Sequence, residues 1–260
     1  MIENAVKRKL AQGLPVVGHW ISLPSPSVVE IMAGFGMDWL LIDTEHGPAS
    51  GERVEDLIRA MQGTSVTPFM RVARNDPALI KQALDRGAFG VLVPLVNTVD
   101  DARAAVAGAK YPPDGIRGVA GTRANRYGAD LPEYFAAWNR EVLVAVQIET
   151  AEAVRNVEAI AAVPGIDVLY IGPNDLSASL SQFRRFDAPE FRRAVDAILQ
   201  AAKRAGVTAG YHTASVEEAL ERVEQGFRFV GLSTDARLLA AIMGTTWERL
   251  RQGLPSRAPR

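Results

Sequence analysis

Short, almost continuously apolar segments recur along the whole chain, and stretches with helical features separate them. Such runs are typical of strands that are buried on both faces, as in a parallel sheet covered by helices. Eight strands are predicted, at Val16–Ser22, Trp39–Asp43, Thr67–Val72, Gly90–Val96, Leu143–Glu149, Val168–Gly172, Thr208–His212 and Phe229–Leu232. Eight strand–helix units in 260 residues indicate an α/β fold of the (β/α)8 TIM-barrel type rather than an open, doubly wound sheet.

Helix start and stop signals lie between these strands. Asp76-Pro77 is an N-cap followed by proline at the first helical position, and Ser215–Glu218 fits a capping box. Gly87, Gly206 and Gly226 each follow a helical stretch, where glycine commonly ends a helix. The apolar runs and the helix start and stop signals therefore both support an alternation of strands and helices.

One interval breaks this alternation. The segment Lys110 to Glu141, between a helix near Asp101–Ala109 and the strand at Leu143, is rich in glycine, proline and arginine. In a barrel such an excursion is usually a functional loop or an oligomer contact. No change in composition marks a second domain, so residues 1–260 are expected to form one domain with a frayed tail at 253–260.

Composition narrows the class of protein. No apolar run approaches the ~20 residues of a membrane-spanning helix, and Met1–Leu10 lacks the apolar region of a secretory signal. The chain has no cysteine, which excludes disulfides, thiolate metal sites and cysteine nucleophiles and fits a reducing compartment. A net charge of −1 with interspersed signs favours neither nucleic acid nor an anionic membrane. A soluble, cytoplasmic protein is expected.

Charged residues stand where three of the strands end. Glu149 ends one apolar run, Asp175 follows another, and Asp43, Glu45 and His46 follow a third. A charge is not buried unpaired inside an apolar strand, and the carboxyl ends of barrel strands converge on one face. Converging carboxylates repel one another unless a cation lies between them. These strand ends therefore predict a metal site with a titratable base beside it.

Glu149 and Asp175 are the candidate metal ligands. Mg²⁺ and Mn²⁺ take oxygen ligands and keep water molecules that a substrate can replace. The alternative for each residue is a cap on the helix that follows it. Because both carboxylates stand at adjacent strand ends, the metal is favoured over two separate caps.

His46 is the candidate base. Asp43 can accept a hydrogen bond from one imidazole nitrogen and leave the other free to take a proton. Glu45 either faces the barrel wall or pairs with a cation. Arg71 offers a fork of donors suited to a carboxylate or an oxyanion, or it forms a salt bridge at the rim; Arg74 competes for the same role.

Other signals are weaker. The segment Gly172–Ser177 offers backbone N–H groups to a small anion or is an ordinary turn, and Ser233–Asp235 holds a phosphate or is a plain N-cap. Gly115–Gly118 is not a dinucleotide fingerprint. No lysine ends a strand, which argues against a Schiff-base mechanism.

These segments together resemble the HpcH/HpaI family of metal-dependent (class II) pyruvate aldolases. The resemblance runs in order through nearly the whole chain, at Trp39–Pro48, Met70-Arg71, Asn75–Pro77, Gly115–Gly118, Gln147–Thr150 and Ile171–Ser177. It implies a TIM barrel with an N-terminal helix and a C-terminal helix, here within 236–250, that is exchanged between subunits of a homohexamer, a dimer of trimers.

The resemblance also implies the chemistry. A 4-hydroxy-2-oxo acid is reversibly cleaved to pyruvate, or hydroxypyruvate, and an aldehyde through a metal-stabilised enolate, with Mg²⁺, Mn²⁺ or Co²⁺ as cofactor. Glu149 and Asp175 then hold the metal, His46 with Asp43 forms the base pair, and Arg71 steadies the oxyanion. Substrate contacts are implied for Trp20, Gln147, Gly172, Pro173 and Asn174.

Some positions depart from the family pattern. Asn174 stands where alanine is common, Thr44 where glycine is common, and Tyr211-His212 at the end of strand seven is unusual. Each adds a polar side chain near the pocket, so the acceptor aldehyde stays open, as do the roles of Tyr211 and His212.

Two rival functions remain. One is another metal-enolate barrel lyase that acts on a malyl or citryl thioester or a phosphoenolpyruvate-type substrate. Arg117, Arg123 and Arg126 in the long segment can offer a thioester enzyme a basic surface. The other is a non-catalytic barrel, which the retained strand-end carboxylates disfavour.

Overall fold

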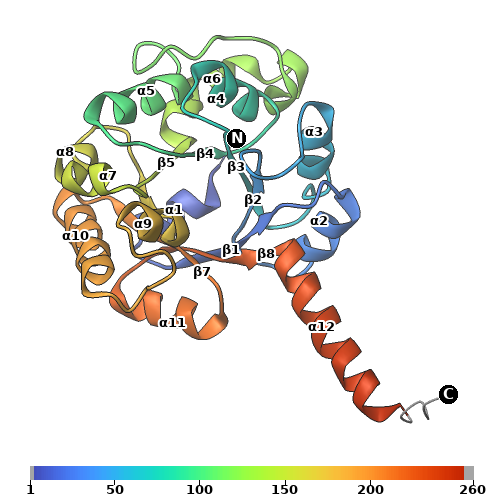
Figure 1. Cartoon of the computed structure of the whole chain (residues 1–260). Coiled ribbons are helices and arrows are strands. Elements are labelled where there is room, and N and C mark those ends of the chain that lie inside the picture. The colour runs from blue at the N-terminus through green and yellow to red at the C-terminus, as the bar shows by residue number, and fades with distance from the viewer. Residues whose placement is uncertain (1–2, 255–260) are drawn as a thin grey trace.

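Eight parallel strands close into a barrel in chain order, with β8 beside β1, in the computed structural model, which describes residues 3–254 (Figure 1). The strands are β1 (Val16–Ile21), β2 (Trp39–Asp43), β3 (Thr67–Arg71), β4 (Gly90–Val93), β5 (Leu143–Gln147), β6 (Val168–Ile171), β7 (Thr208–Thr213) and β8 (Phe229–Thr234). All eight predicted strands are present, so the predicted TIM-barrel fold is confirmed. The differences lie at the carboxyl ends, where several strands stop one to three residues early and β7 and β8 run slightly further.

Helices surround the barrel (Figure 1). They are α1 (Ala5–Ala11), α2 (Pro26–Ala33), α3 (Glu52–Arg59), α4 (Pro77–Asp85), α5 (Val99–Ala109), α6 (Leu131–Glu141), α7 (Ala151–Arg155), α8 (Val157–Ala161), α9 (Pro173–Ser179), α10 (Pro189–Ala205), α11 (Val216–Gln225) and α12 (Asp235–Gly253), with a 3₁₀ helix η1 (Arg123–Gly128). Asp76 is the predicted N-cap of α4, and Ser215 accepts a backbone N–H bond at the start of α11. The predicted capping box is only half formed, because Glu218 accepts from the backbone N–H of Ala214 and not from that of Ser215. Gly206 and Gly226 end α10 and α11 in the left-handed conformation that glycine adopts readily.

Two apolar clusters hold the fold together. One fills the space between strands and helices, and the other fills the barrel interior, where Trp39 stacks on Phe229 with ring centres 4.5 Å apart. The N-terminal helix α1 adds Val6 to the interior cluster. Filling the interior in this way leaves the carboxyl ends of the strands as the open face of the barrel.

The long segment before β5 is only partly a loop, which corrects the sequence interpretation. Its last part is α6, which begins with a proline in its first turn. Arg117 in the preceding irregular part is fully buried and ion-pairs with Asp85 at 2.7 Å. Its guanidinium carbon lies 4.7 Å from the ring centre of Tyr111 and 4.6 Å from that of Trp138. An ion pair and aromatic stacking therefore tie this segment to the barrel.

The C-terminal helix α12 projects away from the barrel (Figure 1). It carries a series of exposed apolar side chains, namely Leu238, Leu239, Ile242, Met243, Trp247 and Leu250. Gly253, expected in the frayed tail, is the last residue of α12, while 255–260 lie outside the described residues. Among the described helices, none has the length and apolarity needed to cross a bilayer.

Candidate active site

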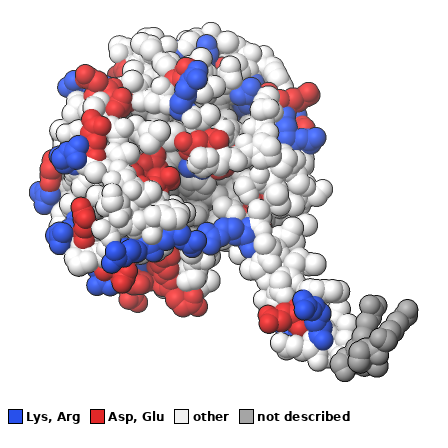
Figure 2. Space-filling view, viewed as in Figure 1, with Lys and Arg blue, Asp and Glu red and all other residues white. Residues whose placement is uncertain are grey.

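A cavity of about 290 Å³ opens at the carboxyl ends of the strands. Figure 2 shows this face hollowed at the centre of the barrel, with acidic side chains beside the hollow. Its walls come from residues at the ends of seven strands and from the turns that follow them: Trp20, Ser22, Asp43, His46, Arg71, Gln147, Tyr170, Gly172, Pro173, Asn174, Asp175, His212, Thr234 and Arg237. Barrel enzymes carry their reacting groups on this face.

Arg71 and Asp43 form a buried ion pair at the ends of β3 and β2. Nε of Arg71 donates to Oδ1 of Asp43 at 2.9 Å, and Nη2 donates to Oδ2 at 2.7 Å. Burial raises the pKa of Asp43, but the hydrogen bonds and charge of Arg71, with the backbone N–H groups of His46 and Glu45, outweigh it and lower that pKa. Glu45 also forms an ion pair with Arg71, at 2.9 Å. Of the two alternatives for Glu45, facing the barrel wall or pairing with a cation, the structure therefore shows the second.

The predicted pairing of Asp43 with the His46 imidazole is wrong. The Asp43 carboxylate accepts a hydrogen bond from the backbone N–H of His46, at 3.3 Å, but none from the imidazole. Its two oxygens are directed at Arg71 instead. The His46 side chain is exposed and lines the cavity without a hydrogen bond to any described residue. Asp43 therefore orients the arginine and the turn after β2, not the imidazole.

Glu149 is buried just beyond the end of β5, with 3% of its surface exposed. It accepts hydrogen bonds from the backbone N–H of Leu95 at 2.8 Å and from the Gln147 amide at 2.5 Å. Burial raises the pKa of Glu149 to about 7; the Leu95 N–H lowers it, and the charges of Asp175 and Glu45 raise it further. A carboxylate in this position is costly to ionise without a nearby cation.

The helix-cap alternative for the two carboxylates is excluded. Thr150, not Glu149, caps α7 by accepting from the backbone N–H of Ala153 at 3.0 Å. Gly172 is the N-cap residue of α9, and Asp175 in the first turn makes no side-chain cap. Neither carboxylate is therefore used as a helix cap.

Their donor set fits a hard divalent cation. Arg71 is engaged by Asp43 and Glu45, and neither Glu149 nor Asp175 has an ion-pair partner within residues 3–254. A Cβ at Gly172 would lie 2.8 Å from Oε2 of Glu149, so glycine leaves the room this carboxylate occupies. No group of three or more acidic or histidine side chains in the described part of the chain could enclose a metal. Two protein ligands would leave the other coordination positions to water and substrate.

Trp20 and Gln147 connect the polar groups of the cavity. The guanidinium carbon of Arg71 lies 4.4 Å from the Trp20 ring centre, and Nε1 of Trp20 donates to the Tyr170 hydroxyl at 3.2 Å. Gln147 accepts from Nη1 of Arg71 at 3.4 Å and donates to Glu149. The side chains therefore hold one another in fixed orientations before a substrate binds.

The structure brings the residues predicted for the site together. All of them line the cavity except Glu149, which is bonded to the lining residue Gln147. Arg74 does not compete with Arg71, because it is exposed and pairs with Asp76 outside the cavity. The sequence analysis missed three lining residues, Ser22, Tyr170 and Arg237, whereas Thr234 lies in the segment Ser233–Asp235 and is the N-cap of α12. Tyr170 could have been found from strand alternation, which directs it into the barrel.

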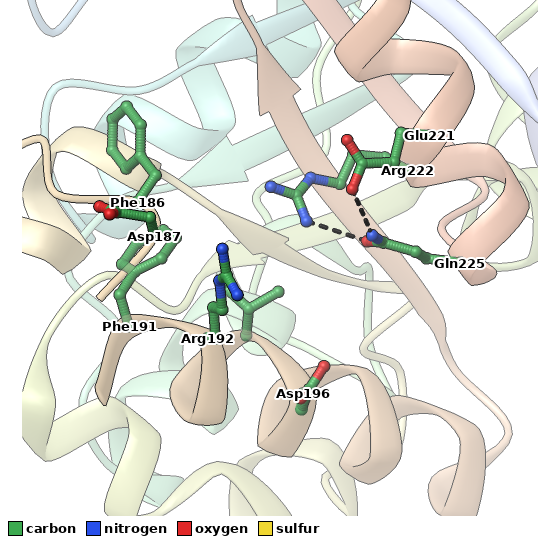
Figure 3. Close-up of a pocket in the computed structure, with 9 residues that line it drawn as sticks. Phe186, Asp187, Phe191, Arg192, Asp196, Glu221, Arg222 and Gln225 are labelled. Atoms are coloured by element: carbon green, nitrogen blue, oxygen red, sulfur yellow. Dashed lines mark hydrogen bonds between the residues drawn. The ribbon is translucent and has the colours of Figure 1, made fainter. Parts of the chain in front are cut away.

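A larger cavity, of about 470 Å³, lies on the outside of the barrel between α10 and α11 (Figure 3). There Gln225 accepts from Arg222 and donates to Glu221, both at 2.9 Å. Arg222 also lies over the Tyr211 ring, 4.2 Å from its centre. Tyr211, whose role the sequence left open, therefore packs against a helix outside the barrel and has a structural role. Because this cavity lies on the helical outside of the barrel, away from the carboxyl ends of the strands, it is not the reaction site.

Comparison with known proteins shows the family of this chain. Residues 17–241 match the family model described as HpcH/HpaI aldolase/citrate lyase. A relative from Klebsiella pneumoniae subsp. pneumoniae, named 5-keto-4-deoxy-D-glucarate aldolase, is 38% identical over 89% of this chain and 91% of its own. One from Shigella sonnei, named 4-hydroxy-2-oxo-heptane-1,7-dioate aldolase, is 39% identical over 92% of each chain. A crystal structure of an HpcH/HpaI aldolase/citrate lyase family protein from Burkholderia cenocepacia J2315 superposes with a TM-score of 0.91 at 38% identity, over 95% of this chain and 99% of the other.

Proposed function

This chain belongs to the HpcH/HpaI aldolase/citrate lyase family and is a lyase of the aldolase type, and we propose a reaction and a cofactor for it. The proposed reaction is the reversible cleavage of a 4-hydroxy-2-oxo acid to pyruvate, or hydroxypyruvate, and an aldehyde. The proposed cofactor is a divalent metal ion. One observation carries the proposal. Among the described residues, two carboxylates have no ion-pair partner and lie near the fixed donor fork of Arg71: Asp175 in the cavity wall, and Glu149, which is bonded to the lining residue Gln147.

Glu149 and Asp175 would hold the metal and supply its oxygen ligands. When bound, Mg²⁺, Mn²⁺ or Co²⁺ would act as a Lewis acid that polarises the ketone of the oxo acid. Arg71, oriented by Asp43 and Glu45, stabilises the oxygen on which negative charge develops as the enolate forms. Gln147 and the turn Gly172–Asn174 border the space for the oxo acid.

His46 moves the proton in this scheme. Its ring is exposed in the cavity and makes no hydrogen bond with the described residues, so its nitrogens are available. In the cleavage direction the 4-hydroxyl proton passes to His46, directly or through a water molecule, and the C3–C4 bond breaks. The aldehyde leaves, and the remaining enolate takes up a proton at carbon to give pyruvate.

Pyruvate release from 4-hydroxy-2-oxo acids tests the proposal. Dialysis against EDTA should abolish the release, and Mg²⁺, Mn²⁺ or Co²⁺ should restore it. Full activity in completely stripped protein would contradict the metal assignment. No pyruvate from a panel of 4-hydroxy-2-oxo acids, with each metal supplied, would contradict the reaction itself.

Of the three arginines on which the thioester alternative depended, only Arg126 is exposed, and it lies 3.4 Å from Asp130. Arg117 is buried against Asp85, and Arg123 donates to the backbone carbonyl of Arg86 at 2.7 Å. These two arginines stabilise the fold and are not presented to a nucleotide carrier. Cleavage of an acyl-CoA substrate, assayed beside pyruvate release, should therefore be undetectable.

We also propose that the chain assembles as a hexamer, a dimer of trimers, in which α12 is exchanged between neighbours. Trp247 and Ile242 on α12 are more than half exposed, and so are Leu220 on α11 and Phe35 just after α2. Covering such a surface by a second copy would remove apolar area from water. Trp247→Asp should shift the mass in sedimentation analysis to smaller species, while the exposed Glu248→Ala should not.

A further inference from the structure

The hydroxyl of Tyr170 has no part in the chemistry proposed so far, although Tyr170 lines the cavity. This tyrosine stands on β6 and is completely buried, with its ring centre 6.0 Å from that of Phe229 in the barrel interior. Its hydroxyl accepts a hydrogen bond from Nε1 of Trp20 at 3.2 Å. A phenylalanine would supply the same ring for packing, so the hydroxyl has a role beyond filling the barrel.

Gly231 on β8 leaves the space in which this hydrogen bond forms. A Cβ at Gly231 would collide with the hydroxyl oxygen of Tyr170 and lie 2.9 Å from Nε1 of Trp20. Glycine is the one residue type without this carbon, so it admits the hydrogen-bonded pair at such close range. Three strands therefore cooperate in a single side-chain hydrogen bond.

This hydrogen bond fixes the orientation of the Trp20 ring. It is the only one that the Trp20 side chain forms with the part of the chain that the structure describes. Trp20 is only 5% exposed, so an indole N–H that lost Tyr170 would have little access to water as a substitute. An unpaired buried donor is costly, and the ring orientation that keeps the bond is therefore favoured.

Trp20 in turn supports the face of Arg71. The guanidinium carbon of Arg71 lies 4.4 Å from the centre of the Trp20 ring, which is a cation–π contact. Asp43 and Glu45 hold the nitrogens of the same guanidinium by ion pairs, at 2.7 and 2.9 Å. Ion pairs restrain the edge of the guanidinium, whereas an aromatic ring against its face restrains its tilt. Tyr170, Trp20 and Arg71 thus form a chain of contacts from the barrel interior to the reaction centre.

Tyr170 is not suited to proton transfer. Burial raises the pKa of its hydroxyl, although the hydrogen bond from Trp20 and the charge of Arg71 lower it. The hydroxyl therefore stays protonated at neutral pH. Its contribution comes from its position and from the hydrogen bond that it accepts.

We propose that Tyr170 is a positioning residue: its hydroxyl holds the Trp20 ring against Arg71, so that the guanidinium keeps the orientation in which it stabilises the enolate oxygen. Donors stabilise a developing charge best when their orientation is fixed in advance, and a displaced donor loses much of this effect. The inference rests on the aldolase function proposed above.

Tyr170→Phe tests this role in pyruvate release from the 4-hydroxy-2-oxo acid that the parent cleaves fastest, with Mn²⁺ supplied. It should lower kcat about 10-fold and change KM less than about 2-fold, because the support of Arg71 matters most in the transition state. The pH profile of kcat should stay parental, and a shifted profile would assign the hydroxyl to proton transfer and overturn the inference. Tyr211→Phe is the matched control, a buried tyrosine on the neighbouring strand whose hydroxyl accepts from Arg222 outside the barrel, and it should keep the parental kcat.

A double-mutant cycle with Trp20→Phe identifies the route of the effect. Trp20→Phe keeps an aromatic face for Arg71 and removes the N–H, so adding Tyr170→Phe should lower kcat by less than about 2-fold more. A loss of about 10-fold in both backgrounds would mean that the hydroxyl does not act through Trp20, and would overturn the inference.

Gly231→Ala disturbs the same hydrogen bond while both of its partners are retained. The added carbon would take the place of the hydroxyl, so the substitution should lower kcat in the parent and have a smaller effect in Tyr170→Phe, where that place is free. Parental kcat in Tyr170→Phe would overturn the inference while leaving the aldolase function intact. No pyruvate from the parent with any 4-hydroxy-2-oxo acid would overturn both.

Discussion

Arg71 and Asp43 are directly opposite each other on β3 and β2, and two hydrogen bonds of 2.9 and 2.7 Å join them. Both side chains are almost completely buried. The guanidinium is therefore oriented by the protein before any substrate arrives, which is the arrangement expected of a group that stabilises developing charge.

Removing the Asp43 carboxylate should destabilise the fold. Asp43→Ala leaves a buried guanidinium with Glu45 as its remaining ion-pair partner, and the expected loss in free energy of unfolding is about 3 kcal/mol. Urea denaturation measures it. The control is Asp56→Ala, which breaks a surface pair with Arg59 and should cost less than about 1 kcal/mol. Equal losses of unfolding free energy in the two variants would mean that the buried Arg71–Asp43 pair stabilises the fold no more than a surface pair does.

Strand positions and strand-end chemistry could be predicted from the sequence because both depend on short apolar runs. A buried parallel strand reads as continuous hydrophobicity, and its end is marked by the first charge. The partner of Asp43 was predicted wrongly because His46 is close in sequence, whereas Arg71 is close through the β2–β3 register. That register was available in principle, since both residues end adjacent strands.

Other features depend on packing that a single sequence does not display. The helix α6 follows a glycine- and proline-rich stretch, so the proline in its first turn was not recognised as a helix start. Arg237 lies three residues beyond a strand in an ordinary helix cap, and its place at the cavity follows from the closure of the barrel. His212 stood out as unusual, but its neighbours Trp20 and Arg237 are distant in sequence.

His46→Ala should reduce the rate of cleavage at least about 100-fold, the effect typical of losing a general base. Because the side chain is exposed, the free energy of unfolding should stay within about 0.5 kcal/mol of the parent. Steady-state pyruvate release and urea denaturation measure the two quantities. Ser50→Ala, in the same loop and also exposed, should match the parent in both. Parental turnover in His46→Ala would remove this residue from the mechanism.

Gly172→Ala should weaken metal binding while sparing the fold. The added Cβ would come within 2.8 Å of Oε2 of Glu149 and 3.1 Å of Nε2 of Gln147, so both side-chain ends must move. Mn²⁺ affinity, measured by calorimetry, should fall at least about 10-fold. Gly244→Ala on α12, where nothing lies within 4 Å of the new carbon, should leave the affinity unchanged. Undiminished affinity in Gly172→Ala would indicate that the metal does not depend on the observed position of Glu149.

The stability of the fold should depend on pH through His212. Burial, with the charges of Arg71 and Arg237, lowers the pKa of His212 to about 4; Asp43 opposes this, and His19 adds to it. In the unfolded chain a histidine titrates near pH ~6.5, so between pH ~4 and ~6.5 the unfolded state binds more protons. Stability therefore rises with pH across this window, and acidification from pH ~6.5 to ~4 should cost up to about 3 kcal/mol.

Urea denaturation at a series of pH values separates this residue from the others. His212→Gln removes the titrating group, so the slope of stability against pH between ~4 and ~6.5 should become shallower, while stability above pH ~7 changes little. Burial also lowers the pKa of His19, so a smaller slope of the same sign should remain. If His212→Gln follows the parental curve throughout, the imidazole does not stay neutral in the folded barrel, because a ring that is already protonated gives no such dependence.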